Sequence, residues 1–127
     1  MFKVSSAQYD ALSRDSEARF RDWVRGFFDD ELTEARDARA AAEGVAPDAL
    51  IDRLTDRARA RGLHSFSAVS NFIAVALQTH PEFDADPEVD ALFTRTPLQE
   101  DALLRTVVNA VRPATWRRLK AEGPGGG

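Results

Sequence analysis

The sequence predicts an all-α fold: a single compact bundle of about five helices over residues 1–122, followed by a disordered Gly-rich tail at 123–127. Apolar residues recur at helical spacing along nearly the whole chain, and no segment alternates like a half-buried strand. The length of 127 residues fits one domain, and eight Phe and two Trp supply apolar surface for a core. The chain has no Cys, so disulfides cannot stabilise it.

The first predicted helix begins at Ser5 or Ser6, either of which can cap it. Its apolar positions recur at helical spacing and are Tyr9, Leu12, Phe20, Trp23, Val24, Phe27 and Phe28. The acidic run at 29–31 can start a new helix, so we expect a kink or a break there. The alanine-rich segment 35–43 is helix-prone, has little to bury and ends at Gly44.

Two further helices follow with clear start and stop signals. Pro47 suits the first position of a helix that runs to about Arg61 and stops at Gly62. Ser65 can cap the next helix, which extends to about residue 78 and contains no charged residue, so we expect it at the domain centre with Phe72 and Ile73 buried. One side of this helix is small enough for another helix to approach, and its residues are Ser67, Ser70, Asn71 and Ala74.

The last third of the chain is predicted to contain a loop and three shorter elements. Residues 80–86 form the loop, in which Phe83 inserts between helices, and Asp86 followed by proline begins a short helix. The segment 96–99 matches a capping box with Pro97 at the first position of a long helix. Pro113 interrupts that helix and leaves a short amphipathic piece around Trp116.

Charge and hydropathy exclude several classes of partner. A net charge of −4 gives no general attraction to nucleic acid or to an anionic membrane. The helix pair around Gly62 has the layout of a helix-turn-helix, but the would-be recognition helix has no Lys or Arg, so we expect no nucleic-acid binding. The longest stretch without acidic or basic residues, 62–81, is too polar to span a membrane. The first residues lack the apolar run of a signal peptide, so we expect a cytoplasmic protein.

An acidic series is the most conspicuous chemical feature, and its members are Glu82, Asp84, Asp86, Glu88 and Asp90. Such spacing can bind calcium, but Val89 stands where an EF-hand needs its turn glycine and Arg95 where it needs a bidentate Glu. We therefore expect no metal and no cofactor. Five like charges in nine residues repel one another, which predicts an acidic rim that meets a basic surface on a partner protein.

Catalytic signals are absent from the sequence. The only histidines, His64 and His80, flank the uncharged helix at ends about 20 Å apart, so they cannot easily share one metal. There is no G-x-S-x-G, no Gly-rich phosphate loop and no H-E-x-x-H. We predict a protein that is not an enzyme. The alternative from a different class is a small metal-dependent hydrolase that uses His80 and Asp84.

One family resemblance lies in residues 51–87. Its elements occur in the order Ile51-Asp52-Arg53, Arg57-Ala58, Gly62-Leu63-His64-Ser65, Val69, Phe72-Ile73, Leu77 and Pro81-Glu82-Phe83-Asp84-Ala85-Asp86-Pro87. This order resembles small helical accessory proteins encoded beside spike and effector genes of bacterial type VI secretion systems. In that family an Arg- and Ala-rich helix ends in a glycine turn, and a Ser- or Thr-capped helix and a P-x-F-D-x-D-P loop follow.

The resemblance implies an accessory role with no catalytic residues. The leading hypothesis is a non-enzymatic adaptor or chaperone-like protein that binds a secretion effector or a spike component. The runner-up is an immunity or antitoxin protein, since a small acidic domain can fill the basic cleft of a nuclease toxin, with the carboxylates at 82–90 as the contact.

Overall fold

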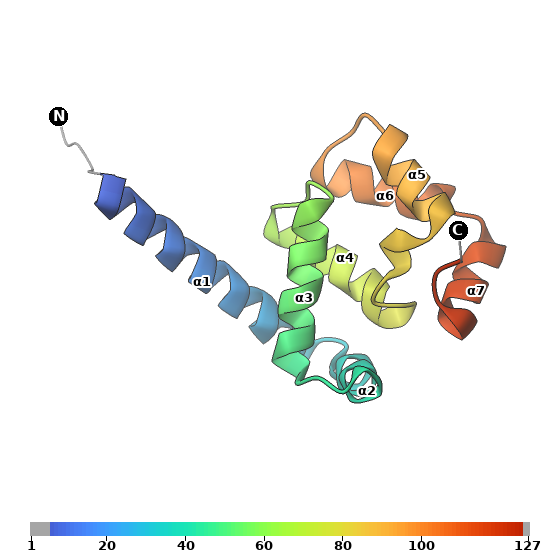
Figure 1. Ribbon diagram of the computed structural model, residues 1–127, viewed down its shortest axis with the longest axis horizontal. Helices are drawn as coiled ribbons and strands as arrows, with labels where there is room; N and C mark the ends of the chain where they lie inside the picture. The colour runs from blue at the N-terminus through green and yellow to red at the C-terminus, as the bar shows by residue number, and fades with distance from the viewer. Residues whose placement is uncertain (1–5, 126–127) are drawn as a thin grey trace.

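The computed structural model of the chain describes the backbone of residues 6–125 and the side chains of residues 14–125. Over this range the protein is all-helical, without a strand (Figure 1). Its elements are α1 (Ser6–Asp30), α2 (Thr33–Glu43), α3 (Pro47–Ala60), α4 (Phe66–Gln78), the 3-10 helix η1 (Phe83–Ala85), α5 (Pro87–Arg95), α6 (Glu100–Ala110) and α7 (Pro113–Glu122). The all-α class is confirmed. The predicted number of about five helices is too low, because the alanine-rich segment and the piece after Pro113 are helices of their own.

Helix α4 lies at the centre of the fold, where α1, α2, α3 and α6 pack against it. Phe72 and Ile73 are fully buried, as predicted. Because α4 carries no charged side chain, it can be covered on several sides without a desolvation penalty. The Ser65 hydroxyl accepts a hydrogen bond from the Ala68 amide at 3.1 Å, which confirms the predicted cap.

The expected break after the first helix occurs at residues 31–32. Leu32 adopts a left-handed backbone conformation with φ 56°, which ends α1 and redirects the chain into α2. The Thr33 hydroxyl donates to the carbonyl oxygen of Asp29 at 3.0 Å and so binds one of the last carbonyls of α1. The predicted cap Ser5 and the side chains of Tyr9 and Leu12 lie outside the described residues.

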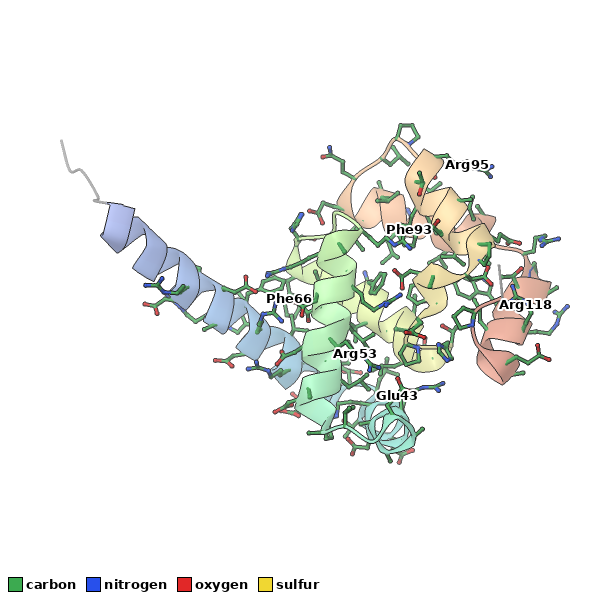
Figure 2. The ribbon with its side chains drawn as sticks, viewed as in Figure 1. Glu43, Arg53, Phe66, Phe93, Arg95 and Arg118 are labelled. Atoms are coloured by element: carbon green, nitrogen blue, oxygen red, sulfur yellow. The ribbon has the colours of Figure 1, made fainter. Side chains whose placement is uncertain are left out.

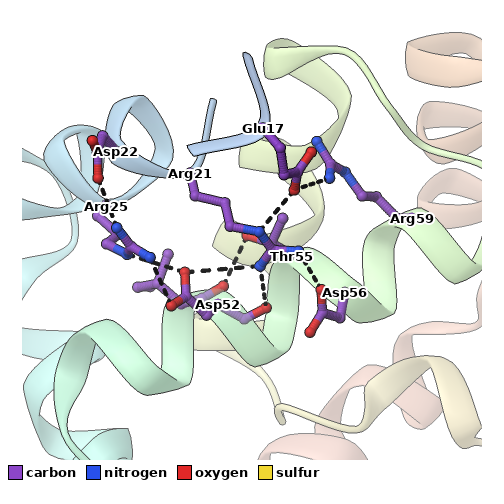
Figure 3. A network of polar contacts seen from close by, with 9 residues as sticks. Glu17, Arg21, Asp22, Arg25, Asp52, Thr55, Asp56 and Arg59 are labelled. Carbon is purple, nitrogen blue, oxygen red and sulfur yellow. Dashed lines mark hydrogen bonds and ion pairs between the residues drawn. The ribbon is translucent and has the colours of Figure 1, made fainter. Parts of the chain in front are cut away.

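Ion pairs hold the second half of α1 against α3 (Figure 3). Arg21 donates to Glu17 Oε1 at 2.8 Å and to Asp56 Oδ1 at 2.5 Å. Arg25 binds both carboxylate oxygens of Asp52, at 3.0 and 2.9 Å. Bidentate pairing of this kind fixes the direction of α1 relative to α3.

The start of α6 differs from the prediction. Residues 96–99 form no capping box, because the Thr96 hydroxyl donates back to the carbonyl oxygen of Leu92 at 2.6 Å and closes α5. Helix α6 begins at Glu100, whose φ is 50°. Its carboxylate accepts hydrogen bonds from the backbone amides of His64 at 3.0 Å and Ser65 at 3.2 Å. Glu100 thus binds the chain entering α4 instead of capping its own helix.

The described part of the C-terminal tail is packed against the domain. The Gly125 amide donates to Asp86 Oδ1 at 2.8 Å. Gly123 has φ 82°, and a Cβ there would meet His80 Nε2 at 3.0 Å. Disorder was predicted for 123–127, yet 123–125 take a defined position, while 126–127 lie outside the described residues. No helix within the described range is long and apolar enough to cross a membrane.

Candidate protein-binding surfaces

Asp84 lies inside the loop and not on an exposed rim. Its side chain is only 6% exposed. One carboxylate oxygen accepts hydrogen bonds from Arg57 Nε at 2.9 Å and Nη2 at 2.7 Å, and the other accepts from Arg61 Nε at 2.9 Å. The Arg61 guanidinium also stacks on the Phe93 ring, 5.1 Å from its centroid. The prediction of an exposed acidic rim is wrong for Asp84, because a carboxylate at this depth requires cationic partners.

Asp86 is fully buried and caps α5, as predicted. Its Oδ2 accepts from the Glu88 amide at 3.1 Å, and its Oδ1 accepts from Arg118 Nη2 at 2.6 Å and from the Gly125 amide at 2.8 Å. Burial by itself would raise the pKa of Asp86, but these hydrogen bonds outweigh it and lower the pKa. Asp86 therefore joins α5, α7 and the C-terminal segment.

Of the other three carboxylates, Glu82 precedes η1, and Glu88 and Asp90 belong to the first turn of α5. Glu88 accepts from the backbone amide of Arg112 at 2.8 Å and from its Nε at 2.7 Å. Asp90 accepts from Arg61 Nη1 at 2.6 Å, whereas Glu82 is exposed. All of the series except Glu82 is thus paired with arginines of the same chain, and a free acidic rim is not formed. Partner binding by these five residues stays a prediction, to which Glu82 is the most accessible contributor.

The two histidines lie at opposite ends of α4 and do not share a site. His64 is exposed. His80 Nδ1 accepts a hydrogen bond from the Glu82 amide at 3.0 Å, and partial burial, followed by the charge of Arg39, lowers the pKa of His80. No hydrogen bond links His80 to Asp84, its partner in the hydrolase alternative, within the described residues. In that same range no group of three or more His, Asp or Glu side chains could hold a metal ion.

A shallow groove of about 420 Å³ lies between α4 and α6. Buried and half-buried apolar side chains form its floor, and they are Ala74, Val75, Leu104 and Val108. Exposed polar side chains form its rim, and they are Asn71, Gln78, Asp101, Arg105 and Asn109. The volume lies in the range typical of binding pockets, and the rim amides can both donate and accept hydrogen bonds. We call this feature the α4–α6 groove.

An aromatic stripe along α1 is the second candidate surface, formed by Ser16, Phe20, Trp23 and Phe27. Trp23 is 66% exposed and Phe27 37%. The Phe27 ring packs edge to face with that of Phe66 on α4, with 5.8 Å between centroids, and Phe66 is labelled beside α1 in Figure 2. Farther along α1 a hollow of about 270 Å³ is lined by Ser16, Arg19, Phe20 and Trp23. Exposed Trp and Phe side chains are characteristic of interaction surfaces.

Sequence reasoning found one wall of the α4–α6 groove and missed the other. The small side of α4, with Asn71 and Ala74, indicated that another helix could approach. Nothing in the sequence indicated that Leu104 and Arg105 of α6 would line the opposite wall.

Comparisons with protein-family models, characterised proteins and solved structures find no match to this chain. The resemblance over residues 51–87 therefore depends on the sequence motifs alone, and a functional proposal has to be argued from the surfaces.

Proposed function

We propose that this chain is a non-enzymatic accessory protein, an adaptor or chaperone-like protein, that binds an effector or spike component of a type VI secretion system. The α4–α6 groove is the observation that carries the proposal of protein binding. The motif order in residues 51–87 supports the link to secretion. An immunity or antitoxin role has lost its main support, because the carboxylates that would meet a basic toxin are largely paired within the chain.

The chemistry of the groove suits an amphipathic helix. Val75, Leu104 and Val108 offer an apolar floor for the large side chains of one helix face. The amides of Asn71 and Asn109 stand at the edges, where they can bind polar groups that flank an apolar stripe. Because α4 presents no charge and Ala74 is small, a partner helix can lie close to the α4 wall, while on the α6 wall it meets Asp101 and Arg105 and needs polar groups opposite them.

The groove is held in a fixed shape by the surrounding structure. On another side of α4, Phe72 packs against Phe83 with ring centroids 4.9 Å apart and anchors this helix in the core. At the far end of the groove Asp101 accepts a hydrogen bond from Ser67 at 3.1 Å, which ties α6 to α4. A preformed groove requires little ordering when a partner binds, which favours affinity.

The test is a binding measurement with purified spike and effector proteins of the host's type VI system, taken one at a time. Ala74→Arg fills the groove and should weaken the complex at least tenfold. Ala42→Arg is the matched control, since it introduces the same side chain at an exposed position of α2, and it should bind like the wild type.

The outcomes separate the parts of the proposal. Binding that Ala74→Arg leaves unchanged would show that the groove is not the contact. A wild-type chain that binds none of the spike and effector proteins would show that the secretion role is wrong.

A further inference from the structure

The first half of α1 extends away from the rest of the molecule (Figure 1). The described contacts that fix α1 begin at Glu17, which pairs with Arg59, and continue to Arg25, which binds α3, and to the fully buried Val24 and Phe28. The described side chains before Glu17, those of residues 14–16, are exposed, so this side of α1 is open to a partner.

The aromatic stripe is the surface that such a partner would cover. Trp23 is two-thirds exposed, whereas its neighbour Val24 faces the body of the protein and is fully buried. Consecutive residues of a helix point about 100° apart, so the stripe and the buried face lie on different sides of α1. Arg59 of α3 lies over one side of the Phe20 ring, 4.5 Å from its centroid, and Phe66 of α4 packs against Phe27. A second helix therefore reaches the stripe along Ser16 and Trp23, beside these two contacts.

The part of the stripe formed by Ser16, Phe20 and Trp23 is symmetric in sequence about Ser16, whereas Phe27 lies outside it because its mirror position is a serine. Helical spacing continues it from Phe20 and Trp23 back through Ser16 to positions 12 and 9, which are Leu12 and Tyr9. Apolar positions thus stand four and seven residues to either side of Ser16. In an antiparallel pair of helices with a twofold axis beside Ser16, position 12 faces the partner's Phe20 and position 9 faces the partner's Trp23. A face with this symmetry is complementary to a second copy of itself.

The charges beside the stripe agree with the same arrangement. Asp15 and Arg19 are both exposed, and neither forms a salt bridge within residues 14–125. Antiparallel pairing about Ser16 brings Arg19 within about one helical turn of the partner's Asp15, on the same flank of the helix pair. The twofold axis repeats this contact, so the pair gains two opposite-charge contacts.

We infer that two copies of this chain associate through antiparallel α1 helices about a twofold axis at Ser16. The small serine at the axis lets the helices approach to about 8–10 Å, and the side chains of Phe20 and Trp23 are removed from water. The dimer surface shares no residue with the α4–α6 groove, so a dimer presents two grooves.

Cross-linking tests the position of the axis. Because the chain has no Cys, Ser16→Cys introduces a single thiol, and mild oxidation of this full-length variant should give a covalent dimer. Ala18→Cys is the matched control, since it is exposed on the opposite side of α1 and should remain mostly monomeric. Sedimentation of the wild-type chain should give twice the monomer mass of 14.0 kDa. A monomeric wild-type chain, or equal cross-linking of both variants, overturns the inference.

Charge reversal distinguishes antiparallel from parallel pairing. Asp15→Arg and Arg19→Asp, made separately, place like charges across both contacts and should raise the dimer dissociation constant roughly 2- to 30-fold. The combined variant restores opposite charges and should return to the wild-type value. In a parallel pair these positions do not meet, so failure of the combined variant to recover would contradict the antiparallel arrangement.

Discussion

The loop at 80–90 and helix α1 contain the same kinds of residue in opposite surroundings. In the loop, Phe83 is fully buried and packs against Phe72 and Trp116, with ring centroids 4.9 and 6.1 Å away. On α1, Trp23 is two-thirds exposed. The charged groups follow the same division, since the Asp84 side chain is 6% exposed and that of Asp56, which binds α1, is 66% exposed.

The comparison shows that surroundings decide what each residue contributes. A buried carboxylate must be paired, so losing its arginine leaves an unsatisfied charge, whereas an exposed carboxylate is solvated by water when its partner is removed. The loop is therefore a structural joint that links α3, α5 and α7. On helix α1, Trp23 stays exposed when one chain folds, whereas Phe27 and Phe20 are partly covered by Phe66 and Arg59.

The largest expected difference concerns the aromatic residues. Phe72→Ala should lower the free energy of unfolding by about 3–5 kcal/mol, because it leaves a cavity against Phe83. Trp23→Ala should change it by less than about 0.5 kcal/mol. Urea unfolding, followed by circular dichroism at concentrations where the chain is monomeric, measures both. Similar losses for the two variants would show that Trp23 also contributes to the fold.

The next largest difference concerns the arginines. Arg61→Ala removes one of the two cations that bind Asp84 and the only described partner of Asp90, and it should cost about 2–3 kcal/mol. Arg25→Ala removes a more exposed pair with Asp52 and should cost less than about 1 kcal/mol. The same unfolding measurement applies. If Arg25→Ala lowered the free energy of unfolding as much as Arg61→Ala, burial of the ion pair would not explain the difference between the two regions.

Acid should destabilise the loop joint. The folded pKa values of Asp86 and Glu88 are lowered, because hydrogen bonds to both carboxylates outweigh the effect of burial. Their stabilising contribution is complete above the unfolded values of 3.8 and 4.5, and it is lost as the pH falls through the folded values.

Asp86→Asn tests this pH dependence. Thermal unfolding followed from neutral pH to about pH 2 should show a shallower loss of stability for this variant than for the wild type. An unchanged slope for Asp86→Asn would show that other carboxylates govern acid unfolding.

The smallest effect is that of salt. Near 1 M salt the Debye length is about 3 Å, so exposed ion pairs are weakened more than buried ones. The stability difference between wild type and Arg25→Ala should therefore nearly disappear, and that between wild type and Arg61→Ala should persist. Chemical denaturation at low and high salt measures both stability differences. If salt reduced the two differences equally, the contrast between exposed and buried ion pairs would be wrong.

The sequence by itself determined the helical class and most helix boundaries. Ser65 caps α4, Gly44 ends α2 at φ 69°, and proline begins α3 and α5. These signals act within a few residues, so they work in the same way whatever surrounds them. The burial of Phe72 also followed from sequence, because an uncharged helix is stable only when it is covered.

Only the tertiary structure decided which distant groups meet. Asp84 is bound by Arg61, 23 residues away, and Glu100 binds the amide of His64, 36 residues away. The expected outward position of Asp84 and the predicted start of α6 failed for this one reason. A carboxylate in the sequence has the same charge in any fold, but whether it faces water, an arginine or a free backbone amide depends on how the helices pack, and packing is set by the whole core and not by neighbouring residues.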